Sequence, residues 1–475
     1  MAENFARLLE AAARRSPDAP ALMWEGGALT HAQLDRQAGG FARFLAHRGV
    51  KPGDRIALAI PNRWPFAVAL LGGLKLGATV VPLDPLLSAD ERRAVLDDLR
   101  PSVVAHEVLG DEADWATVAE VDAPALILYT SGSTGAPKGA MLSHRALAVA
   151  VESWMGPVMA LRPDDAVLAV LPLSHSFGLN GALLAPLLAG ARAVLLERFA
   201  PKAVVAAIHT HRISVFPGVA TMFRRVLDSP ALTDAALPGL RLCVSGAAPC
   251  PWELAREWRE RIGVRILRGY GMTELFRPIS YLAGEPADFS DAIGRPVPGV
   301  EVRIVDDDGR PLPPGAAGEL LIRTPAALDG YFGAPEETRA VLADGWFRTG
   351  DLATVRPDGY VRLEGRKRER ILRGGYSVFP QEIEAVLLAH PSVAEAAVVG
   401  EPHAELGEEV VAFVALRDGT REQPEALVTF CKQRLAGFKY PRRVTILDRL
   451  PRAATGKILK SRLLAGGTAS PVAGQ

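Results

Sequence analysis

The segment Tyr129–His144 has the sequence YTSGSTGAPKGAMLSH and directly follows the apolar run Ala125–Leu128, ALIL. A buried strand that opens into glycine and hydroxyl residues offers backbone amides, hydroxyl donors and a lysine to phosphate oxygens. The segment therefore predicts a site for a nucleotide polyphosphate, with a flexible surface turn as the alternative. It is not the P-loop of kinases and GTPases, because Gly139 follows Lys138 where that pattern requires Ser or Thr.

Apolar runs around this segment predict the fold class. Between about residues 54 and 270 the runs RIALAI, ALILYT, AVLAVLP, ISVFPG, LRLCVSG and VRILRGYG alternate with helical patterns. Such alternation is typical of a parallel α/β sheet, and several runs end in Gly, Ser, Thr or His. Because ligands of open α/β sheets bind beyond the carboxyl ends of the strands, these polar ends predict one shared crevice.

The C-terminal part has a different pattern. After about residue 295 brief strands are broken by the turn sequences DDDGR, LPPGAAGE and RPDGY, and from Pro380 a helical pattern precedes the strand-like VAEAAVVG and EVVAFVAL. The basic stretch Gly365–Gly375 joins the two regions as an exposed connector. We therefore expect an α/β protein with a large N-terminal domain of parallel α/β layers plus a small β unit, residues 1–367, and a small, mobile α+β domain, residues 368–475.

The composition is that of a folded, soluble protein with more than one domain. The 475 residues are 49% hydrophobic and 23% charged, and 54 Lys and Arg balance 54 Asp and Glu, so no global field attracts nucleic acid or an anionic membrane. The three cysteines lack the spacing of a disulfide framework or a zinc site. The N-terminus lacks the pattern of a secretory signal, and Pro186 and Arg192 in the apolar stretch Gly178–Leu196 favour a buried helix over a membrane span. We expect a cytoplasmic location, no nucleic-acid partner and no stable membrane insertion.

Four further motifs follow in order: GYGMTE, RTGD, GRKRERILRGGYSVFPQEIE and PRAATGK, which are residues 269–274, 348–351, 365–384 and 451–457. Together with TSGSTGAPKG they resemble the motifs of the adenylate-forming superfamily, which includes acyl-CoA synthetases, carrier-protein-loading adenylation domains and beetle luciferases. The resemblance covers nearly the whole chain. It implies a large domain that binds ATP and a carboxylic acid, a small mobile domain, and adenylation of the acid.

The resemblance assigns most motif residues to ATP. Tyr270 is expected against the adenine, Thr273 on the α-phosphate, and Glu274 on Mg²⁺, because a carboxylate suits a hard cation. Asp351 is expected to accept hydrogen bonds from both ribose hydroxyls, and Arg366 to hold ribose and phosphate. A structural turn, a cap or a solvated connector is the alternative for each. The other expected nucleotide-binding residues are Thr130, Ser131, Gly132, Ser133, Thr134, Gly135 and Lys138 of the loop, Gly246, Ala247 and Ala248 of a second adenine wall, and Gly271 and Met272.

The small domain is expected to supply the mobile groups. Lys457 resembles the lysine that reaches the carboxylate and the α-phosphate when this domain closes, where its charge stabilises developing negative charge. Gly374 and Gly375 resemble the hairpin glycines that come to the site for the thiol step. Arg368 stands where the family keeps its hinge residue, usually Asp or Lys, and is therefore a departure from the pattern. Such a movement lets one cleft serve two reactions.

The stretch Leu171–Leu184, LPLSHSFGLNGALL, resembles the motif that lines the acyl pocket. His175 is expected as a gate between the acid and thiol sites, with a buried core histidine as the alternative. Arg268 and Arg277 flank GYGMTE, and either could clamp the second carboxylate of a dicarboxylic acid or be a structural arginine. The expected acid-binding residues, for which ordinary core packing is the alternative, are Phe177, Phe216, Gly218, Val219 and Met222.

The resemblance therefore implies an acid–thiol ligase. It would activate a medium- or long-chain fatty acid or an aryl acid with ATP to an acyl-adenylate and pyrophosphate, and then transfer the acyl group to coenzyme A. Coenzyme A is favoured because no carrier-protein domain follows, and the Asp that anchors the amino group in amino-acid activators is not evident. The alternatives are loading of a carrier protein in trans, a dicarboxylate-CoA ligase, light-emitting oxidation, and a nucleotide-binding homologue without ligase chemistry. The individual acid, the acceptor, the oligomeric state and the pathway stay open.

Overall fold

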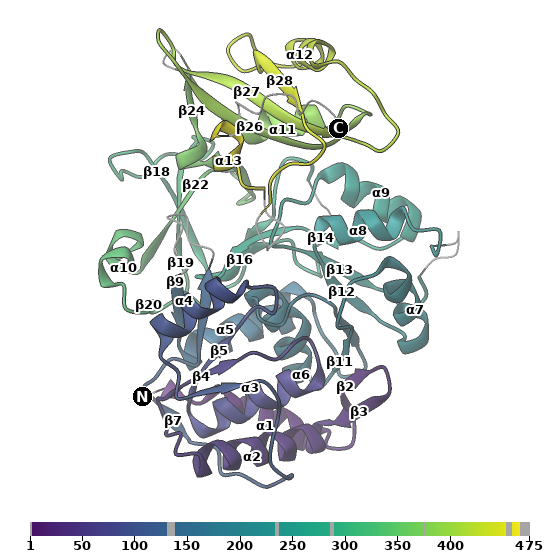
Figure 1. Ribbon diagram of the computed structural model, residues 1–475, viewed down its shortest axis with the longest axis vertical. Coiled ribbons are helices and arrows are strands. Elements are labelled where there is room, and N and C mark those ends of the chain that lie inside the picture. The colour runs from purple at the N-terminus through teal and green to yellow at the C-terminus, as the bar shows by residue number, and fades with distance from the viewer. Residues whose placement is uncertain are drawn as a thin grey trace, which may run out of the picture. The chain divides into compact units, whose positions relative to one another are not determined.

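The computed structural model describes residues 2–130, 138–232, 237–285, 289–373, 376–452 and 458–465 (Figure 1). The chain divides into two compact units. Unit 1 consists of Met1–Val302, Leu321–Arg348 and Asp358–Val361, and unit 2 consists of Arg303–Leu320, Thr349–Pro357 and Arg362–Gln475. The predicted α/β class is confirmed, whereas a functional boundary between residues 367 and 368 stays a prediction.

Unit 1 contains a seven-stranded sheet with the order β14-β13-β12-β10-β11-β2-β3. Neighbouring strands pair in parallel, except in the hairpin of β2 and β3. The runs AVLAVLP, ISVFPG, LRLCVSG and VRILRGYG supply β10, β12, β13 and β14, as predicted. The strands are β2 (Pro20–Trp24), β3 (Gly27–Thr30), β10 (Ala166–Ala169), β11 (Arg192–Leu195), β12 (Val215–Gly218), β13 (Leu242–Ser245) and β14 (Ile266–Leu267).

A six-stranded sheet with the order β20-β9-β8-β5-β4-β6 is the second sheet layer of unit 1. Strands β4, β5, β6 and β8 pair in parallel, and β9 returns antiparallel to β8. The strands on either side of the predicted phosphate loop are therefore direct neighbours. The strands are β4 (Arg55–Leu58), β5 (Thr79–Pro82), β6 (Val103–Ala105), β8 (Leu126–Thr130), β9 (Lys138–Leu142) and β20 (Gly330–Tyr331), and a small separate sheet pairs β1 (Ala2–Glu3) with β7 (Glu120–Val121).

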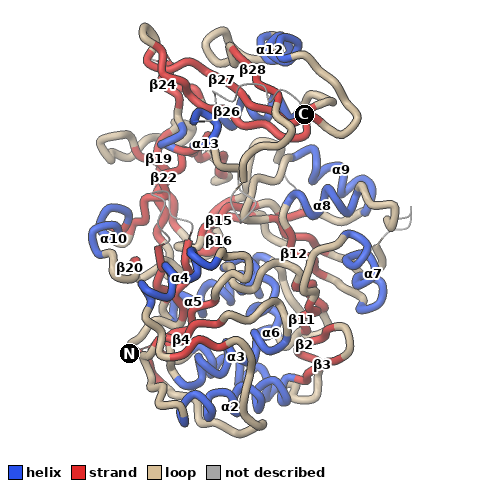
Figure 2. Tube along the Cα trace, in the orientation of Figure 1, coloured by secondary structure: helices blue, strands red, loops and turns tan. Residues whose placement is uncertain are grey.

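Helices pack against both sheets of unit 1 (Figure 2). Helix α2 contacts β2 and β3, α3 contacts β4 and β5, and the two helices pack on each other, so they form a layer between the sheets. Gly72 of α3 permits this approach, because a Cβ there would lie 2.7 Å from the carbonyl oxygen of Ala38 in α2. The helical segments are α1 (Phe5–Arg15), α2 (His31–His47), α3 (Trp64–Leu76), α4 (Ala89–Leu99), α5 (His144–Ser153), η1 (Trp154–Val158), η2 (Gly178–Leu184), α6 (Ala185–Ala189), α7 (Pro201–His211), α8 (Ala220–Leu227), α9 (Trp252–Ile262) and α10 (Pro335–Val341).

An aromatic cluster joins α8 and α9 to the seven-stranded sheet. The ring centroids of Phe216 and Phe223 are 5.0 Å apart, and those of Phe223 and Trp258 are 5.1 Å apart. All three side chains are fully buried. Because burial of one large apolar side chain contributes about 1.5–3 kcal/mol, this cluster stabilises the part of the sheet whose strand ends carry motif residues.

The apolar stretch Gly178–Leu196 does not form the single buried helix that the sequence predicts. It forms the π-helical segment η2, then α6, and then β11. Gly190 ends α6 with a φ of 74°, because a left-handed glycine terminates a helix without steric cost. Within the described residues, every helix is too short or too polar to cross a bilayer.

Unit 2 contains a five-stranded sheet with the order β25-β24-β27-β26, in which β28 pairs with β27. Helix α11 contacts β26, and α12 contacts β28 and α11. The helix and the two strands predicted from Pro380 onward are confirmed, and Ile383 and Leu387 of the helix are fully buried. The elements are β24 (Ile371–Arg373), β25 (Tyr376–Val378), α11 (Pro380–Leu388), β26 (Val393–His403), β27 (Gly407–Leu416), α12 (Pro424–Lys432), β28 (Arg443–Ile446) and α13 (Ser461–Ala465).

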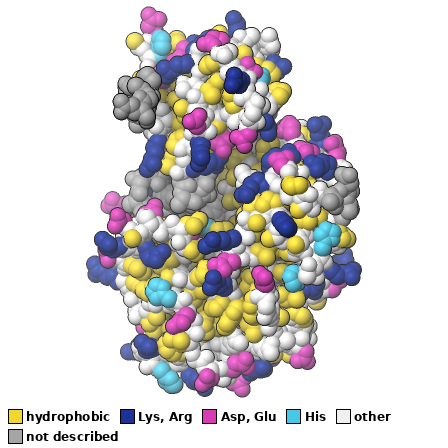
Figure 3. Space-filling model, turned by 45° about the vertical axis from the view of Figure 1, so that its right-hand side comes forward, with side chains coloured by type: hydrophobic (Ala, Val, Ile, Leu, Met, Phe, Trp, Pro, Cys, Tyr) yellow, Lys and Arg dark blue, Asp and Glu magenta, His cyan; other side chains and the backbone are white. Residues whose placement is uncertain are grey.

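A further five-stranded sheet has the order β18-β19-β22-β21, with β23 paired to β22. The division between the units falls within β18, β19, β22 and β23, so no single position in the sequence separates them. Figure 3 shows basic and acidic side chains intermixed on the face in view. The elements of this sheet and of the connector are β18 (Glu301–Val305), β19 (Gly318–Arg323), β21 (Leu342–Ala343), β22 (Trp346–Val355), β23 (Val361–Arg366) and η3 (Lys367–Glu369).

A buried histidine of unit 1 predicts a pH effect on stability. His144 is 1% exposed, its Nδ1 accepts a hydrogen bond from the Phe5 amide at 3.1 Å, and burial lowers its pKa to about 4. Because the folded pKa lies below the unfolded value of about 6.5, the stabilising effect is complete above that pH and is lost as the pH falls toward the folded pKa.

We predict that His144→Asn, which keeps an acceptor but does not titrate, loses less thermal stability between pH 7 and pH 5 than the unmodified protein. The measurement is the melting temperature of both proteins at each pH. An equal loss in the two proteins would contradict the prediction.

Candidate active site

The two ends of the predicted phosphate loop are held together by β8 and β9. Thr130 pairs in register with Lys138, and the Thr130 hydroxyl donates to the Lys138 carbonyl oxygen at 3.4 Å. The structure thus places these two predicted nucleotide-binding residues side by side. The predicted residues Ser131, Gly132, Ser133, Thr134 and Gly135 lie outside the described residues.

Tyr331 of β20 connects two of the motifs. Its hydroxyl donates to Oε1 of Glu274 at 2.8 Å, and the Nζ of Lys138 lies 5.7 Å from the centre of its ring. Burial, together with the Glu274 carboxylate, raises the pKa of Tyr331, so the phenol remains a donor at neutral pH. Tyr331 could not be identified from the sequence, because it lies 57 residues from Glu274 in the chain and belongs to no motif.

GYGMTE forms the hairpin of β15 (Gly269–Met272) and β16 (Phe276–Ser280), which continues to β17 (Arg295–Pro296). A Cβ on Gly271 would lie 2.0 Å from the carbonyl oxygen of Phe276, so only glycine fits there. Tyr270 is 8% exposed, and Met272, Thr273 and Glu274 are half-buried. The hairpin therefore holds Thr273 and Glu274 at a tight turn.

Glu274 supplies one hard-oxygen ligand for a cation. Among the described residues, no group of three His, Cys, Asp or Glu side chains is arranged to hold a metal ion. Mg²⁺ is commonly bound through one or two carboxylates together with substrate phosphates and water. A single Glu274 carboxylate therefore fits an ion that arrives with a nucleotide.

The predicted second adenine wall, Gly246 to Ala248, directly follows β13. Ala247 and Ala248 are exposed, and Ala247 has a φ of 63°. A residue with a side chain in this left-handed region costs roughly 1–3 kcal/mol and is enriched at functional sites. A Cβ on the buried Gly246 would lie 3.0 Å from Cε1 of Phe177, so the wall adjoins a predicted acid-binding residue.

Asp84, which follows β5, holds His175. The Nε2 of His175 lies 2.8 Å from Oδ2 of Asp84, and the Leu86 amide donates to Oδ1 at 2.8 Å. Burial alone would raise the pKa of Asp84, but these two hydrogen bonds outweigh burial and lower it. The ionised carboxylate only accepts, so Nε2 carries the proton. The His175 side chain is 38% exposed, which argues against a buried core histidine.

The predicted acid-binding residues divide between an aromatic pair and the core. Phe177 is half-buried and stacks on Trp154 of η1, with ring centroids 5.4 Å apart. Phe216 is fully buried in the cluster with Phe223 and Trp258, which favours core packing for that residue. Gly218 ends β12, Val219 precedes α8, and Met222 packs on the same cluster. Trp154 belongs to no motif and could not be identified from the sequence.

In unit 2, Asp351 and Arg366 form an ion pair between the neighbouring strands β22 and β23. The Nε of Arg366 lies 2.6 Å from Oδ1 of Asp351, which is 4% exposed. The Asp351 amide donates to the Thr349 hydroxyl at 3.0 Å. The pair brings together a carboxylate and a guanidinium, the two groups expected at the ribose.

The other predicted residues of unit 2 have no described side chains. Arg368 lies in η3, and Gly374, Gly375 and Lys457 lie outside the described residues. The nearby Lys460 forms ion pairs of 2.8 Å with Glu369 and Glu384. Roles for Arg368, Gly374, Gly375 and Lys457 therefore stay predictions.

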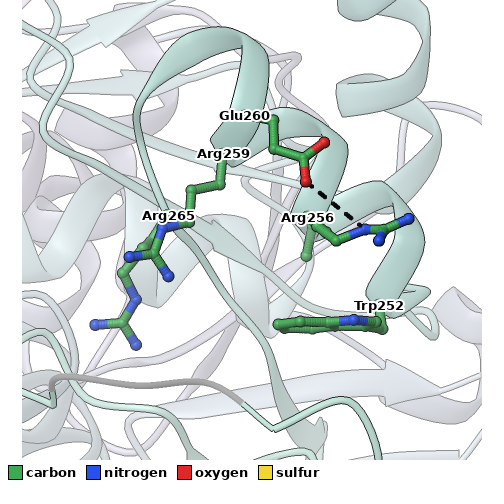
Figure 4. A pocket seen from close by; sticks show the side chains of 6 residues that line it. Trp252, Arg256, Arg259, Glu260 and Arg265 are labelled. Carbon is green, nitrogen blue, oxygen red and sulfur yellow. Dashed lines mark ion pairs between the residues drawn. The ribbon is translucent and has the colours of Figure 1, made fainter.

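A separate hollow of about 390 Å³ on α9 contains none of the predicted site residues. Figure 4 shows Trp252 and Arg256 on one side, and Arg259 and Arg265 on the other. Arg256 pairs with Glu260 at 3.9 Å, and the two side chains are 60% and 66% exposed. Such a solvated pair contributes little to stability.

Comparison with known proteins identifies the family. Residues 9–121 and 108–332 match the family described as AMP-binding enzyme, and residues 382–457 match the AMP-binding enzyme C-terminal domain. The chain belongs to the AMP-binding enzyme family. The predicted resemblance to adenylate-forming enzymes is confirmed.

Relatives of this AMP-binding enzyme are CoA ligases. Feruloyl-CoA synthase of an Amycolatopsis species is 36% identical over 480 residues, which cover 95% of this chain and 96% of that protein. A long-chain-fatty-acid–CoA ligase of Yersinia pestis is 33% identical, with 97% of this chain and 94% of that protein covered.

Solved structures of related enzymes have a similar fold. ATP-bound MatB from Rhodopseudomonas palustris has a TM-score of 0.91 at 31% identity, with coverage of 96% of this chain and 98% of that chain. A benzoate CoA ligase from Burkholderia xenovorans has a TM-score of 0.88 at 31% identity, with coverage of 97% and 99%. This AMP-binding enzyme is an AMP-forming acyl-CoA synthetase, whose substrates are ATP, a carboxylic acid and coenzyme A.

Proposed function

We propose that the acid is an aryl carboxylic acid. The observation that carries this proposal is the stack of Phe177 on Trp154 beside Gly246. The Phe177 ring stacks on Trp154, Phe177 is only half-buried, and an aromatic ring of this kind suits a flat aromatic ligand in an offset stack. The relatives named feruloyl-CoA synthase and benzoate CoA ligase support the same class. A medium- or long-chain fatty acid is the second candidate, supported by the relative named for long-chain fatty acids.

For ATP we propose the roles that the motifs imply. The backbone and hydroxyls between Thr130 and Gly135, together with Lys138, would bind the phosphates. Gly246 to Ala248 and Tyr270 to Met272 would enclose the adenine, and Asp351 with Arg366 would bind the ribose. Glu274 would hold Mg²⁺, which would offset the charge that develops as pyrophosphate leaves.

The proposed first half-reaction forms a bond from a carboxylate oxygen of the acid to the α-phosphorus of ATP, while the bond to the bridging oxygen breaks and pyrophosphate leaves. Thr273 and Lys457 would donate to the oxygens on which negative charge develops. In the second half-reaction the sulfur of coenzyme A bonds to the acyl carbon, the bond from that carbon to AMP breaks, and the thiol proton passes to water. Between the steps, rotation at Arg368 would exchange Lys457 for Gly374 and Gly375.

His175 is proposed as the gate between the acid and thiol sites, and Asp84 as its positioning residue. The hydrogen bond of 2.8 Å and the lowered pKa of Asp84 support this arrangement. A carrier protein in trans stays an alternative acceptor. The cytoplasm stays the proposed location, on the cysteine pattern of the sequence.

The test is a pyrophosphate-release assay with aryl, fatty, dicarboxylic and amino acids, with and without coenzyme A, and with a phosphopantetheinylated carrier protein as the other acceptor. We predict the highest kcat/KM for an aryl acid and formation of its CoA thioester. A highest kcat/KM for a fatty acid, with aryl acids at background, would replace the first candidate by the second.

A further inference from the structure

The loop between β4 and α3 holds Asn62 in a tight turn. The Arg63 amide donates to the Pro61 carbonyl oxygen at 2.6 Å, which closes a three-residue turn centred on Asn62. Arg63 is also the N-cap of α3, so the turn is continuous with a buried helix. The side chain of Asn62 is half-buried and reaches a segment that begins 109 residues later in the chain.

The side-chain amide of Asn62 binds the backbone on both sides of Pro172. Its Nδ2 donates to the Leu171 carbonyl oxygen at 2.6 Å, and its Oδ1 accepts from the Leu173 amide at 2.8 Å. These are the two groups that a neighbouring parallel strand would use, and an Asn side chain carries both a donor and an acceptor. Leu171 is 3% exposed and Leu173 is fully buried. Loss of Asn62 would therefore take these partners from two peptide groups in a buried segment.

The segment that Asn62 binds leads into His175 through tight backbone contacts. The His175 amide donates to the Pro172 carbonyl oxygen at 3.2 Å, and the Leu179 amide donates to the His175 carbonyl oxygen at 2.8 Å. A Cβ on Gly178 would lie 2.2 Å from the Pro172 carbonyl oxygen, so the two backbones pack directly on each other. A shift of the backbone at Pro172 would therefore also move His175.

Asn62 and Asp84 hold His175 from adjacent positions of one sheet. Asn62 follows β4 and Asp84 follows β5, and these strands pair in parallel, so both residues lie at the same edge of the six-stranded sheet. His175 follows β10 of the seven-stranded sheet. Asn62 binds the backbone that leads to His175, whereas Asp84 accepts from the imidazole ring at 2.8 Å. The first contact determines where the ring lies, and the second determines how it is turned.

We propose that Asn62 is a positioning residue for His175, and that it acts on the transfer of the acyl group to coenzyme A. This inference rests on the proposed role of His175 as the gate between the acid and thiol sites. Asn62 acts through the backbone of the segment rather than through the imidazole ring. A displacement of about 1 Å at a reacting site can lower a rate by about 10²-fold, even when the changed residue is remote from the chemistry.

The experiment is a double-mutant cycle of Asn62→Ala and His175→Ala, in which the two half-reactions are measured separately. We expect Asn62→Ala to lower thioester formation from a synthetic acyl-adenylate by about 10²-fold, while ATP–pyrophosphate exchange keeps its rate. In the His175→Ala background, Asn62→Ala should cause little further loss, because a residue that acts through the imidazole has no effect once the imidazole is absent. An independent structural effect would instead add to the effect of His175→Ala.

Two further variants identify the hydrogen bonds as the cause. Asn62→Asp keeps the size of the side chain, but its carboxylate cannot donate to the Leu171 carbonyl oxygen, so it should lose about as much as Asn62→Ala. Arg63→Met is the matched control in the same turn. The Arg63 side chain is 60% exposed and pairs with Glu197, so its loss should leave both half-reactions at their rates.

The outcomes separate this inference from the proposed function. If His175→Ala leaves thioester formation unchanged, the gate role fails and the inference fails with it. If His175→Ala slows this step but Asn62→Ala does not, or if their losses multiply in the double variant, the inference is overturned and the gate role stands. If Asn62→Ala does not fold, the same cycle with Asn62→Asp decides. Failure of both variants to fold would show that Asn62 is needed for folding, which would also overturn the inference.

Discussion

Replacing Lys457 with Ala should lower the rate of acyl-adenylate formation by about 10²-fold or more, while transfer of the acyl group from a supplied acyl-adenylate to coenzyme A should keep its rate. The physical reason is that the ammonium stabilises negative charge that develops only in the first half-reaction. The two half-reactions are measured separately, as ATP–pyrophosphate exchange and as thioester formation from the synthetic adenylate.

Lys460→Ala is the matched control for this prediction. Lys460 is in the same terminal segment, and its ion pairs with Glu369 and Glu384 indicate a structural role. Its loss should lower stability without separating the two half-reactions. If Lys457→Ala slowed both half-reactions equally, the selective role of Lys457 would be wrong.

Replacing Glu274 with Gln should lower pyrophosphate release by about 10²-fold and raise the Mg²⁺ concentration needed for half-maximal rate. The amide keeps the size of the side chain but removes the charge that attracts a hard cation. The measurement is the initial rate across a Mg²⁺ titration, with ATP binding measured by calorimetry in the same series.

Tyr331→Phe is a second variant at the same site, with a smaller expected effect. It removes only the hydrogen bond of 2.8 Å to Glu274 and keeps the ring beside Lys138. Loss of an outer-shell partner typically costs about 10–100-fold in metal affinity or activity, so we expect a smaller effect than in Glu274→Gln. If Glu274→Gln needed the same Mg²⁺ concentration for half-maximal rate as the unmodified enzyme, the proposed role of Glu274 as a Mg²⁺ ligand would be wrong.

The sheets of unit 1 could be predicted because their strands are nearly continuous apolar runs. RIALAI and ALILYT form β4 and β8, and the loop expected after ALIL begins where β8 ends at Thr130. Parallel strands buried on both faces read as apolar without alternation, so this signal is strong in the sequence. The division of the chain into units could not be predicted in the same way. Arg303–Leu320 and Thr349–Pro357 belong to unit 2 although residues of unit 1 lie between them in the sequence.

The partners of the site residues could not be predicted. Asp84 lies 91 residues from His175, and it is one acidic residue among 54. Tyr331 and Trp154 likewise belong to no motif, and only the fold brings them to Glu274 and Phe177.

The sequence also does not show which apolar side chains line a pocket and which pack in the core. Phe177 and Phe216 both read as apolar pocket residues, yet one is half-buried in a stack and the other is fully buried in a core. Arg277 could be noted as a neighbour of GYGMTE, but its burial without a described carboxylate is visible only in the structure.

Adenylation of the acid can be tested by tracing a carboxylate oxygen atom of the acid into AMP. The enzyme is given ATP, coenzyme A, Mg²⁺ and an aryl acid labelled with ¹⁸O in its carboxylate, and the AMP is isolated for mass spectrometry. Because the attacking carboxylate oxygen stays on phosphorus when the thiol displaces AMP, we expect a single ¹⁸O atom in each AMP formed. AMP without label, or label in inorganic phosphate together with ADP, would contradict adenylation of the acid.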